Sequence, residues 1–500
     1  MSALGSVIVL LLLIGSCAPE MFEDAATICD RCVCMVANQS SSVFSYDLLD
    51  CSRRNLAYMI SDWPVHFETS NPKHEIVLSL SRNKLGTLQQ LPPTNTTVVF
   101  SCRHCQLDSV SAGLFLDTPN VLRVDLSWNN LTGESVRAEV FRGQYQESSE
   151  YRSLPLDLLY LEGNAITELA EDTFQYIATS LRHLSLAHNP LGQIADGTAR
   201  ALEKLVELRV LNLEYASLTS IDETTFRGMH ALLELYIAGN QFTTIPEEVY
   251  DLTALYFLDL SDNPIEVLHF AHPLAKLHHL NVSSMPVLHT VEIDTFANVA
   301  SLKTMICRNN SALEIFDLLV LQHLHDLHEL DLSQSGLKHL HDPAKTKPEQ
   351  ENYDTSRYAN NLDLLTLIEN PWHCDCALQH VLEHVGFDAM PSYFEEDDTR
   401  CETPYILTSL HLGDLFHIDV CNTLSNDAPN NSYYEKPAFL RPGAIFLSLL
   451  SVAIVLGLGI IIGFVIVFLK RRLKAHGLGF TSPVRYTSVR DSTMSTVYQP

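Results

Sequence analysis

The stretch LLELYIAGNQF at Leu232–Phe242 determines the fold of this chain. Aliphatic residues stand at its first, fourth and sixth positions, asparagine at its ninth and an aromatic residue at its eleventh. One residue of another type separates the fourth position from the sixth. This alternation is the period-two pattern of a short strand with one buried face. One such strand cannot bury that face alone, so we expect the stretch to be one of many stacked units.

The same frame, LxxLxLxxNxL, recurs along most of the 500-residue chain, for example as LRHLSLAHNPL at Leu181–Leu191. Asparagine fills eight of the twelve ninth positions, and Cys105, Ala216, Met285 and Ser335 fill the other four. Most spacings between ninth positions are 22–27 residues, although two are 35. The ninth positions fall at 83, 105, 129, 164, 189, 216, 240, 263, 285, 310, 335 and 370.

This frame resembles the repeat of leucine-rich-repeat proteins and extends over residues 75–372, in about 12 copies. The resemblance implies an α/β-type horseshoe solenoid, with a parallel sheet on the concave side and irregular or helical segments on the convex side. It also implies that the ninth-position asparagines satisfy backbone groups where each coil turns. The two long spacings predict insertions near 133–153 and 338–361. Phenylalanines ten residues after the ninth position are expected to fill the convex side of the core: Phe115, Phe174 and Phe226.

Cysteines cluster at both ends of the repeats. NPWHCDC at 370–376, followed by Cys401 and Cys421, resembles the C-terminal cysteine cap of extracellular leucine-rich-repeat proteins, here 370–422. The resemblance implies the bridges Cys374–Cys401 and Cys376–Cys421, with Trp372 covering the exposed core. Cysteine and histidine also suit a zinc site. In a secreted chain, however, oxidation consumes thiols, so a disulfide cap is the favoured interpretation and we expect no metal.

Four cysteines that follow the predicted signal peptide, at 29, 32, 34 and 51, resemble the N-terminal cap of the same family, here 29–65. Their spacing alone leaves three connectivities open. The resemblance implies two bridges, Cys29–Cys34 and Cys32–Cys51.

Three cysteines remain inside the repeats. Cys102 and Cys105 look like a redox CxxC motif, but they occupy the sixth and ninth frame positions, which face inward. Cys307 occupies another sixth position. We expect all three to be buried structural thiols, and a Cys102–Cys105 bridge is the alternative.

The two apolar runs predict the topology. Residues 1–18 read as a secretory signal peptide. Residues 443–469 carry no charge and are long enough to cross a bilayer, and KRRLK at 470–474 places the following side in the cytoplasm. The sequence thus predicts a single-pass plasma-membrane protein with its N-terminus outside, a stalk at 423–442 and a cytoplasmic tail at 470–500. Small residues spaced four apart, at 453–457 and 459–463, would allow two such helices to pack as a homodimer.

Charge and sequons agree with that topology. The net charge is −28, of which the tail contributes about +5, so residues 1–469 carry about −28 − 5 = −33. Such an acidic exterior disfavours nucleic acid as a partner. In the tail, YTSV from Tyr486 to Val489 resembles a tyrosine-based internalisation signal. Six N-x-S/T sites precede the apolar run and are predicted to be glycosylated: Asn38, Asn95, Asn130, Asn281, Asn309 and Asn430.

The sequence contains no P-loop, GxSxG or HExxH motif, so we expect neither enzymatic activity nor a cofactor. Its many histidines, as in LHHL at 277–280, read as solvated repeat positions. Third, fifth and seventh frame positions point out of the sheet. At these positions the central repeats carry the candidate binding residues: Leu158, Tyr160, Val210, Tyr236 and Phe257. The alternative is that these side chains only pack on neighbouring strands. Glycans at Asn281 and Asn309 would shield the later repeats and leave this patch open.

A solenoid without catalytic motifs is a recognition surface. The resemblance implies a non-catalytic cell-surface protein that binds extracellular or cell-surface protein ligands in adhesion, guidance, or receptor or co-receptor work. The alternatives are an innate-immune pattern receptor that acts through a separate signalling partner, and a matrix or trafficking scaffold.

Overall fold

The computed structural model of the chain describes residues 22–23, 28–37, 46–146, 150–341, 362–384 and 399–421. The chain divides into two units, 1–425 and 426–500, and the described residues lie in the first. The signal peptide, the stalk, the apolar run 443–469, the tail with Tyr486 and Val489, and the sequons at Asn38 and Asn430 lie outside the described residues. In the part of the chain that the structure describes, no helix has the length and apolarity that a membrane crossing needs.

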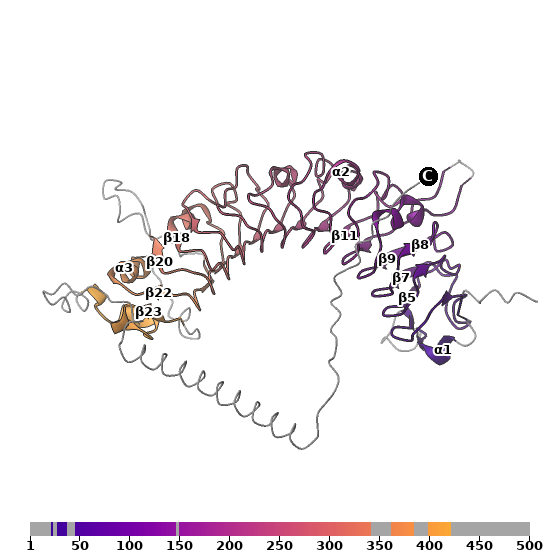
Figure 1. The fold of residues 1–500 in the computed structure, drawn as a ribbon, viewed down its shortest axis with the longest axis horizontal. Helices are drawn as coiled ribbons and strands as arrows, with labels where there is room; N and C mark the ends of the chain where they lie inside the picture. The colour runs from indigo at the N-terminus through magenta and orange to yellow at the C-terminus, as the bar shows by residue number, and fades with distance from the viewer. Residues whose placement is uncertain are drawn as a thin grey trace, which may run out of the picture. The chain divides into compact units, whose positions relative to one another are not determined.

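One sheet of 14 strands runs through the repeat region, and each strand pairs with the strand of the preceding coil (Figure 1). The first two strands pair antiparallel and all later pairs are parallel. This order never reverses, which defines a solenoid. The strands are β2 (Val33–Met35), β3 (Tyr46–Asp50), β5 (Glu75–Ser79), β7 (Thr97–Ser101), β9 (Val121–Asp125), β10 (Leu158–Tyr160), β11 (His183–Ser185), β12 (Val210–Asn212), β13 (Glu234–Tyr236), β14 (Phe257–Asp259), β15 (His279–Asn281), β17 (Thr304–Ile306), β19 (Glu329–Asp331) and β21 (Leu364–Thr366).

The rest of each coil is irregular or briefly helical, and helix α2 (Asp196–Glu203) lies on the opposite side of the repeat region from the strands (Figure 1). The 3₁₀ helices are η1 (Gly133–Ser135), η2 (Ala138–Phe141), η3 (Glu247–Asp251), η4 (Leu318–His323), η8 (Tyr405–Leu407) and η9 (Leu412–Phe416). The remaining helices are α1 (Ile28–Arg31) and α3 (Cys376–His384). Short outer strands also pair: β1 (Phe22–Glu23) with β4 (Met59–Ile60), β6 (Thr87–Leu88) with β8 (Ser109–Val110), β18 (Ile315–Asp317) with β16 (Thr290–Val291) and β20 (His339–His341), and β22 (Trp372–His373) with β23 (Cys401–Thr403). The first predicted insertion holds η1, η2 and a bridge between Tyr145 and Tyr151, whereas 342–361 lie outside the described residues.

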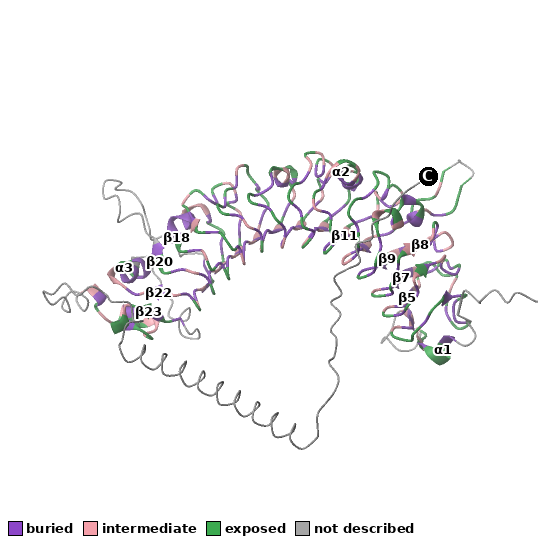
Figure 2. Cartoon of the chain, viewed as in Figure 1, coloured by how far each residue is buried: buried purple, intermediate pink, exposed green. Residues whose placement is uncertain are grey.

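The frame positions account for the core. Leu235 and Ile237, at a fourth and a sixth position, are fully buried, as are their equivalents in neighbouring coils. The predicted phenylalanines Phe115, Phe174 and Phe226 are buried as well. Figure 2 shows buried residues running through the inside of the stacked coils. Each coil therefore completes the core of its neighbours.

A buried asparagine closes each of eight coils. Asn263 donates from Nδ2 to the carbonyl of Leu260 in its own coil, at 2.9 Å, and to that of Ile237 in the preceding coil, at 3.0 Å. Its Oδ1 accepts from the amide of Phe242, at 3.1 Å. The same two-carbonyl pattern holds at Asn83, Asn129, Asn164, Asn189, Asn240, Asn310 and Asn370. Buried backbone groups need such partners, so the implied role of this residue is confirmed.

The structure contains the four cap bridges that the resemblance implies. At the N-terminal end Cys29 joins Cys34 and Cys32 joins Cys51. At the C-terminal end Cys374 joins Cys401 and Cys376 joins Cys421. Trp372 is fully buried beneath this second cap. Both ends of the core are therefore covered by cross-linked segments.

The expectation of free thiols at Cys102 and Cys105 is wrong, because these two residues form a disulfide. Both side chains point into the same coil, and their Cα atoms are 5.7 Å apart, which is within the usual range for a bridge. Among the described cysteines, Cys307 is the free one, and it is buried as expected. Burial raises the pKa of its thiol to about 12.

These assignments predict a labelling pattern. In the folded chain iodoacetamide should label none of the cysteines that the structure describes, because the one thiol among them is buried and protonated. After unfolding without reductant, Cys307 should become the labelled residue of this set. Peptide mapping would measure this, and alkylated Cys102 or Cys105 under these conditions would contradict the bridge.

Candidate recognition surface

The five predicted binding residues lie on the outward face of the sheet between β10 and β14, on all of these strands except β11. The strand register places third-position residues in one row: Leu158, His183, Val210, Glu234 and Phe257. Fifth-position residues form the next row: Tyr160, Ser185, Asn212, Tyr236 and Asp259. The five predicted side chains are all half-buried.

Tyr236 and Phe257 contact each other across β13 and β14, with ring centroids 4.9 Å apart. The hydroxyl of Tyr236 donates to Oε2 of Glu234 at 2.9 Å. Burial raises the pKa of Tyr236, and the hydrogen bond to Glu234 adds to the rise. The hydroxyl therefore stays protonated at neutral pH and remains a donor.

Tyr160 forms a second aromatic group on the same face. Its ring lies 4.8 Å from the ring of His183, and the guanidinium of Arg123 lies over it at 4.8 Å from the centroid. Burial lowers the pKa of His183, so its imidazole is neutral at pH 7. These aromatic side chains therefore do pack on residues of neighbouring strands, as the alternative proposed. The rings are nevertheless only half-buried, so part of each ring remains accessible to a partner.

The face is acidic as well as aromatic. Across the third, fifth, seventh and eighth positions of the five coils that hold β10 to β14, no lysine or arginine occurs. These positions carry five carboxylates: Glu162, Glu214, Glu234, Asp259 and Asp262. Burial raises the pKa of Glu214, and the nearby charges of Asp259 and Glu162 add to the rise. Arg182 and Arg209 stand before β11 and β12, at the opposite end of the strands.

A row of stacked rings, which we call the edge ladder, runs along the ends of the strands. It consists of His104, Trp128, His188 and Tyr215, each at the eighth position of its coil. Centroid distances are 5.8 Å from His104 to Trp128, 5.5 Å from Trp128 to His188 and 4.8 Å from His188 to Tyr215. All four side chains are exposed at the surface.

The backbone explains the stacking. All twelve eighth positions are left-handed, with φ between 50° and 64°, so every coil directs this side chain in the same way. Gly163 interrupts the ladder between Trp128 and His188, and a Cβ there would lie 2.6 Å from Cδ2 of Trp128. The indole ring thus covers the glycine and reaches the histidine beyond it. Tyr215 covers Gly239 in the same manner, with 2.3 Å to an added Cβ.

Sequence reasoning missed this ladder and the ring contacts of several histidines. The histidines at 104 and 188 are exposed, as expected, yet they stack between aromatic neighbours. In the LHHL segment, His279 Nε2 lies 3.0 Å from the hydroxyl of Tyr256, whose ring also stacks on His278. The expectation of solvated histidines is met in exposure at His104 and His188, and the ring contacts are an addition to it. The regular recurrence of the eighth position was the sequence signal that could have revealed the ladder. The residue type at this position varies from coil to coil, however, so no motif marks it.

The described sequons differ in accessibility. Asn95, Asn130 and Asn309 are exposed. Asn281 lies on β15 and is half-buried, and its Nδ2 donates to Oδ2 of Asp259 at 2.9 Å. N-glycosylation replaces one of the two hydrogens on Nδ2, so a glycan at Asn281 would stand on the half-buried sheet face beside this hydrogen bond.

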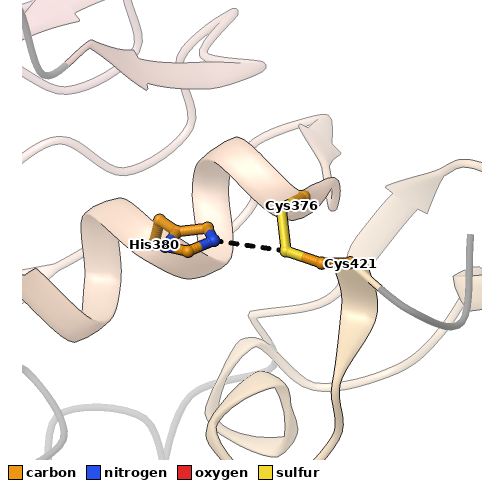
Figure 3. Close-up of side chains that lie close together, drawn as sticks. All are labelled: Cys376, His380 and Cys421. Atoms are coloured by element: carbon orange, nitrogen blue, oxygen red, sulfur yellow. Dashed lines mark hydrogen bonds between the residues drawn. A yellow bond between two sulfur atoms is a disulfide. The ribbon is translucent and has the colours of Figure 1, made fainter. Parts of the chain in front are cut away.

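The C-terminal cap brings two cysteines and a histidine together. His380, one turn after Cys376 on α3, places Nε2 3.2 Å from Sγ of Cys421 (Figure 3). Three such side chains have the chemistry of a partial zinc site. Here the bond between Cys376 and Cys421 removes both thiolates, so the cluster is a disulfide with an adjacent imidazole rather than a metal site. This agrees with the disulfide interpretation of NPWHCDC.

The family model that describes a leucine-rich repeat matches residues 206–265, which contain β12, β13 and β14. Residues 206–265 are leucine-rich repeats. The matched segment includes Val210, Tyr236 and Phe257, so part of the candidate surface lies within family-defining repeats.

The comparisons also give a curated relative and several solved structures. The non-catalytic subunit of Oplophorus-luciferin 2-monooxygenase from Oplophorus gracilirostris is 28% identical over 138 residues, or 24% of this chain. The chain spans 38% of the length of that relative. A chain from the octameric complex of Latrophilin 3, Unc5D and FLRT2 is 19% identical, with a TM-score of 0.46, over 77% of this chain and 97% of that one. The APL1 leucine-rich repeat domain is 18% identical, with a TM-score of 0.43, over 60% and 70%.

The edge ladder predicts a difference between two glycine substitutions. Gly163→Ala and Gly192→Ala both force alanine into a left-handed backbone, with φ of 64° and 68°, at roughly 1–2 kcal/mol each. A Cβ at position 192 meets nothing within 4 Å, whereas one at 163 collides with Trp128. Gly163→Ala should therefore reduce the free energy of unfolding by about 1–3 kcal/mol more.

Denaturant unfolding measures that difference, and tryptophan emission reports the displaced ring in the 163 variant. Equal losses of stability together with unchanged emission would mean that Trp128 does not rest on Gly163.

Proposed function

We propose that this protein is a non-catalytic cell-surface recognition protein that binds an extracellular or cell-surface protein through the outward face of β10 to β14. In this proposal residues 443–469 cross the plasma membrane once, with the repeats outside. Adhesion, guidance, and receptor or co-receptor work all require such a surface.

The observation that carries the proposal is the half-buried aromatic pair of Tyr236 and Phe257, with Tyr160 three and four strands away on the same face. Half-buried rings on a rigid sheet offer a large contact area and lose little side-chain freedom when a partner binds. The parallel sheet holds their backbone in place, so the patch is preorganised. Interface cores are enriched in such residues.

The relationship to known proteins supports the non-catalytic part. The curated relative is named as a non-catalytic subunit. The leucine-rich-repeat fold presents side chains on a regular surface, and the groups assembled on β10 to β14 are rings, carboxylates and amides. This composition suits binding of another protein.

Alanine substitutions test the patch. Tyr236→Ala and Phe257→Ala should each weaken binding by roughly 1–3 kcal/mol, which is about 5- to 150-fold in Kd, because each removes a ring from the centre of the interface. Tyr405→Ala is the matched control, since Tyr405 in η8 is 96% exposed and lies outside the sheet. It should leave affinity unchanged.

The measurement needs a ligand first. A binding screen of residues 19–442 against extracellular proteins supplies one, and a titration of the folded variants then gives the affinities. Thermal melting should be the same for all three variants within a few degrees. Full affinity in both sheet variants would relocate the site to the convex side, the insertions or the caps.

A further inference from the structure

We propose that the edge ladder and the carboxylates beside it bind a basic segment, rich in arginine and lysine, of a protein partner. This inference rests on the proposed function and adds the chemistry of the partner to it.

The apolar half of the site is the ladder itself. Its rings extend over the coils from His104 to Gly239, because Trp128 and Tyr215 each cover a glycine. Although they are stacked, Trp128 remains 40% exposed and Tyr215 46% exposed. The row therefore offers exposed ring surface on which a partner's side chains can pack.

The acidic half lies at the Tyr215 end. Glu162 and Glu214 occupy seventh positions next to the ladder, and Asp262 occupies an eighth position beyond Gly239. Asp262 contributes to the raised pKa of Tyr215, after burial, so its carboxylate is near the phenol. Glu162 lies in the middle of the ladder, on the coil of Gly163, and Arg103 approaches it at 3.1 Å from the His104 side, where Arg103 also lies 3.7 Å from Asp125.

Glu214 lies beside the ladder and presents a carboxylate to a docked cation. It is half-buried, and its Oε2 accepts a hydrogen bond from Nδ2 of Asn212. Burial raises its pKa, and the like charges of Asp259 and Glu162 add to the rise. A cation docked at Glu214 would relieve both effects. An acidic partner or a polyanion would meet repulsion from Glu214, Asp259 and Asp262 at the Tyr215 end of the ladder, which disfavours nucleic acids and sulfated glycans as the occupant.

Arginine and lysine fit this combination of groups. Each has an apolar stem that lies along ring surface and a charged head that reaches a carboxylate. Arginine also pairs with a carboxylate through two parallel hydrogen bonds. A surface that alternates rings with carboxylates therefore selects a segment with repeated basic side chains.

The spacing of the carboxylates sets the register of that segment. Glu162, Glu214 and Asp262 stand on every second coil. Neighbouring strands are about 4.8 Å apart, so the carboxylates recur at about 10 Å. An extended chain advances about 3.3 Å per residue, so basic residues three positions apart match them.

The experiment measures binding of a synthetic peptide to the full-length chain in detergent by fluorescence anisotropy. The probe is a labelled peptide of about twelve residues with arginine at every third position and serine or leucine elsewhere, matched to the spacing derived above. One comparison peptide has the same composition but with its arginines adjacent to one another. A second has glutamate in place of every arginine. The spaced arginine peptide should bind most tightly and the glutamate peptide should not bind.

Two charge-matched double variants separate the site from the general acidity of the chain. Glu214→Gln with Asp262→Asn should weaken the spaced peptide by about ten-fold or more. Glu168→Gln with Glu266→Gln removes the same charge from exposed positions outside the strands and the ladder, and should change affinity by less than about two-fold. Tyr215→Ala should weaken binding of the spaced peptide by about as much as the first double variant does. Both carboxylate double variants should melt at the temperature of the unsubstituted chain.

The outcomes distinguish this inference from the proposed function. Equal effects of the two double variants, equal binding of the spaced and clustered peptides, or no binding of the arginine peptide would overturn the basic-segment site. Tyr236→Ala with Phe257→Ala then reports on the proposed function separately. If this pair abolishes binding of the protein ligand while Tyr215→Ala does not, the sheet patch stands and the ladder site is rejected.

Discussion

In eight coils of the solenoid a buried asparagine side chain donates to two carbonyl groups, one in its own coil and one in the coil before. A coil that turns inside a packed core leaves backbone groups that water cannot reach, and each of them needs a partner. The four exceptions, Cys105, Ala216, Met285 and Ser335, are never in adjacent coils. At Ala216 the amide still donates to Oδ1 of Asn240 in the next coil, so the neighbour satisfies the turn.

The same turn decides what the protein displays. The residue before each ninth position is left-handed in all twelve coils, and this common backbone aligns His104, Trp128, His188 and Tyr215 into one stack. Inward positions thus carry the stability of the fold, and outward positions are free to vary. A solenoid built in this way can change its recognition chemistry by substitution at outward positions without repacking the core.

Much of this could be predicted from the sequence, because frame positions are a local pattern with one physical meaning. The period of leucines located the strands, and Asn263 and its equivalents were assigned correctly. Disulfide formation at Cys102 and Cys105 depended on the distance between two inward side chains, which spacing alone does not fix. The stacking of the edge ladder depends on the left-handed backbone at the eighth position. The repeat frame has no fixed residue type at that position, so the sequence did not reveal the stack. The grouping of Tyr236 with Phe257 followed from strand register, but the acidity of the face emerged only when seventh and eighth positions were placed beside it.

The central claim is that recognition uses the outward face of the central strands. Photo-crosslinking from a benzoylphenylalanine at position 210 or 206 tests it most directly. Val210 lies on β12 in the middle of the face, whereas Val206 is 46% exposed but lies between α2 and β12, outside the sheet. Irradiation of cells that carry the full-length chain should yield a covalent adduct with the same extracellular protein from position 210 and not from position 206. An adduct from position 206 alone would place the ligand on the other side of the coils and contradict the account.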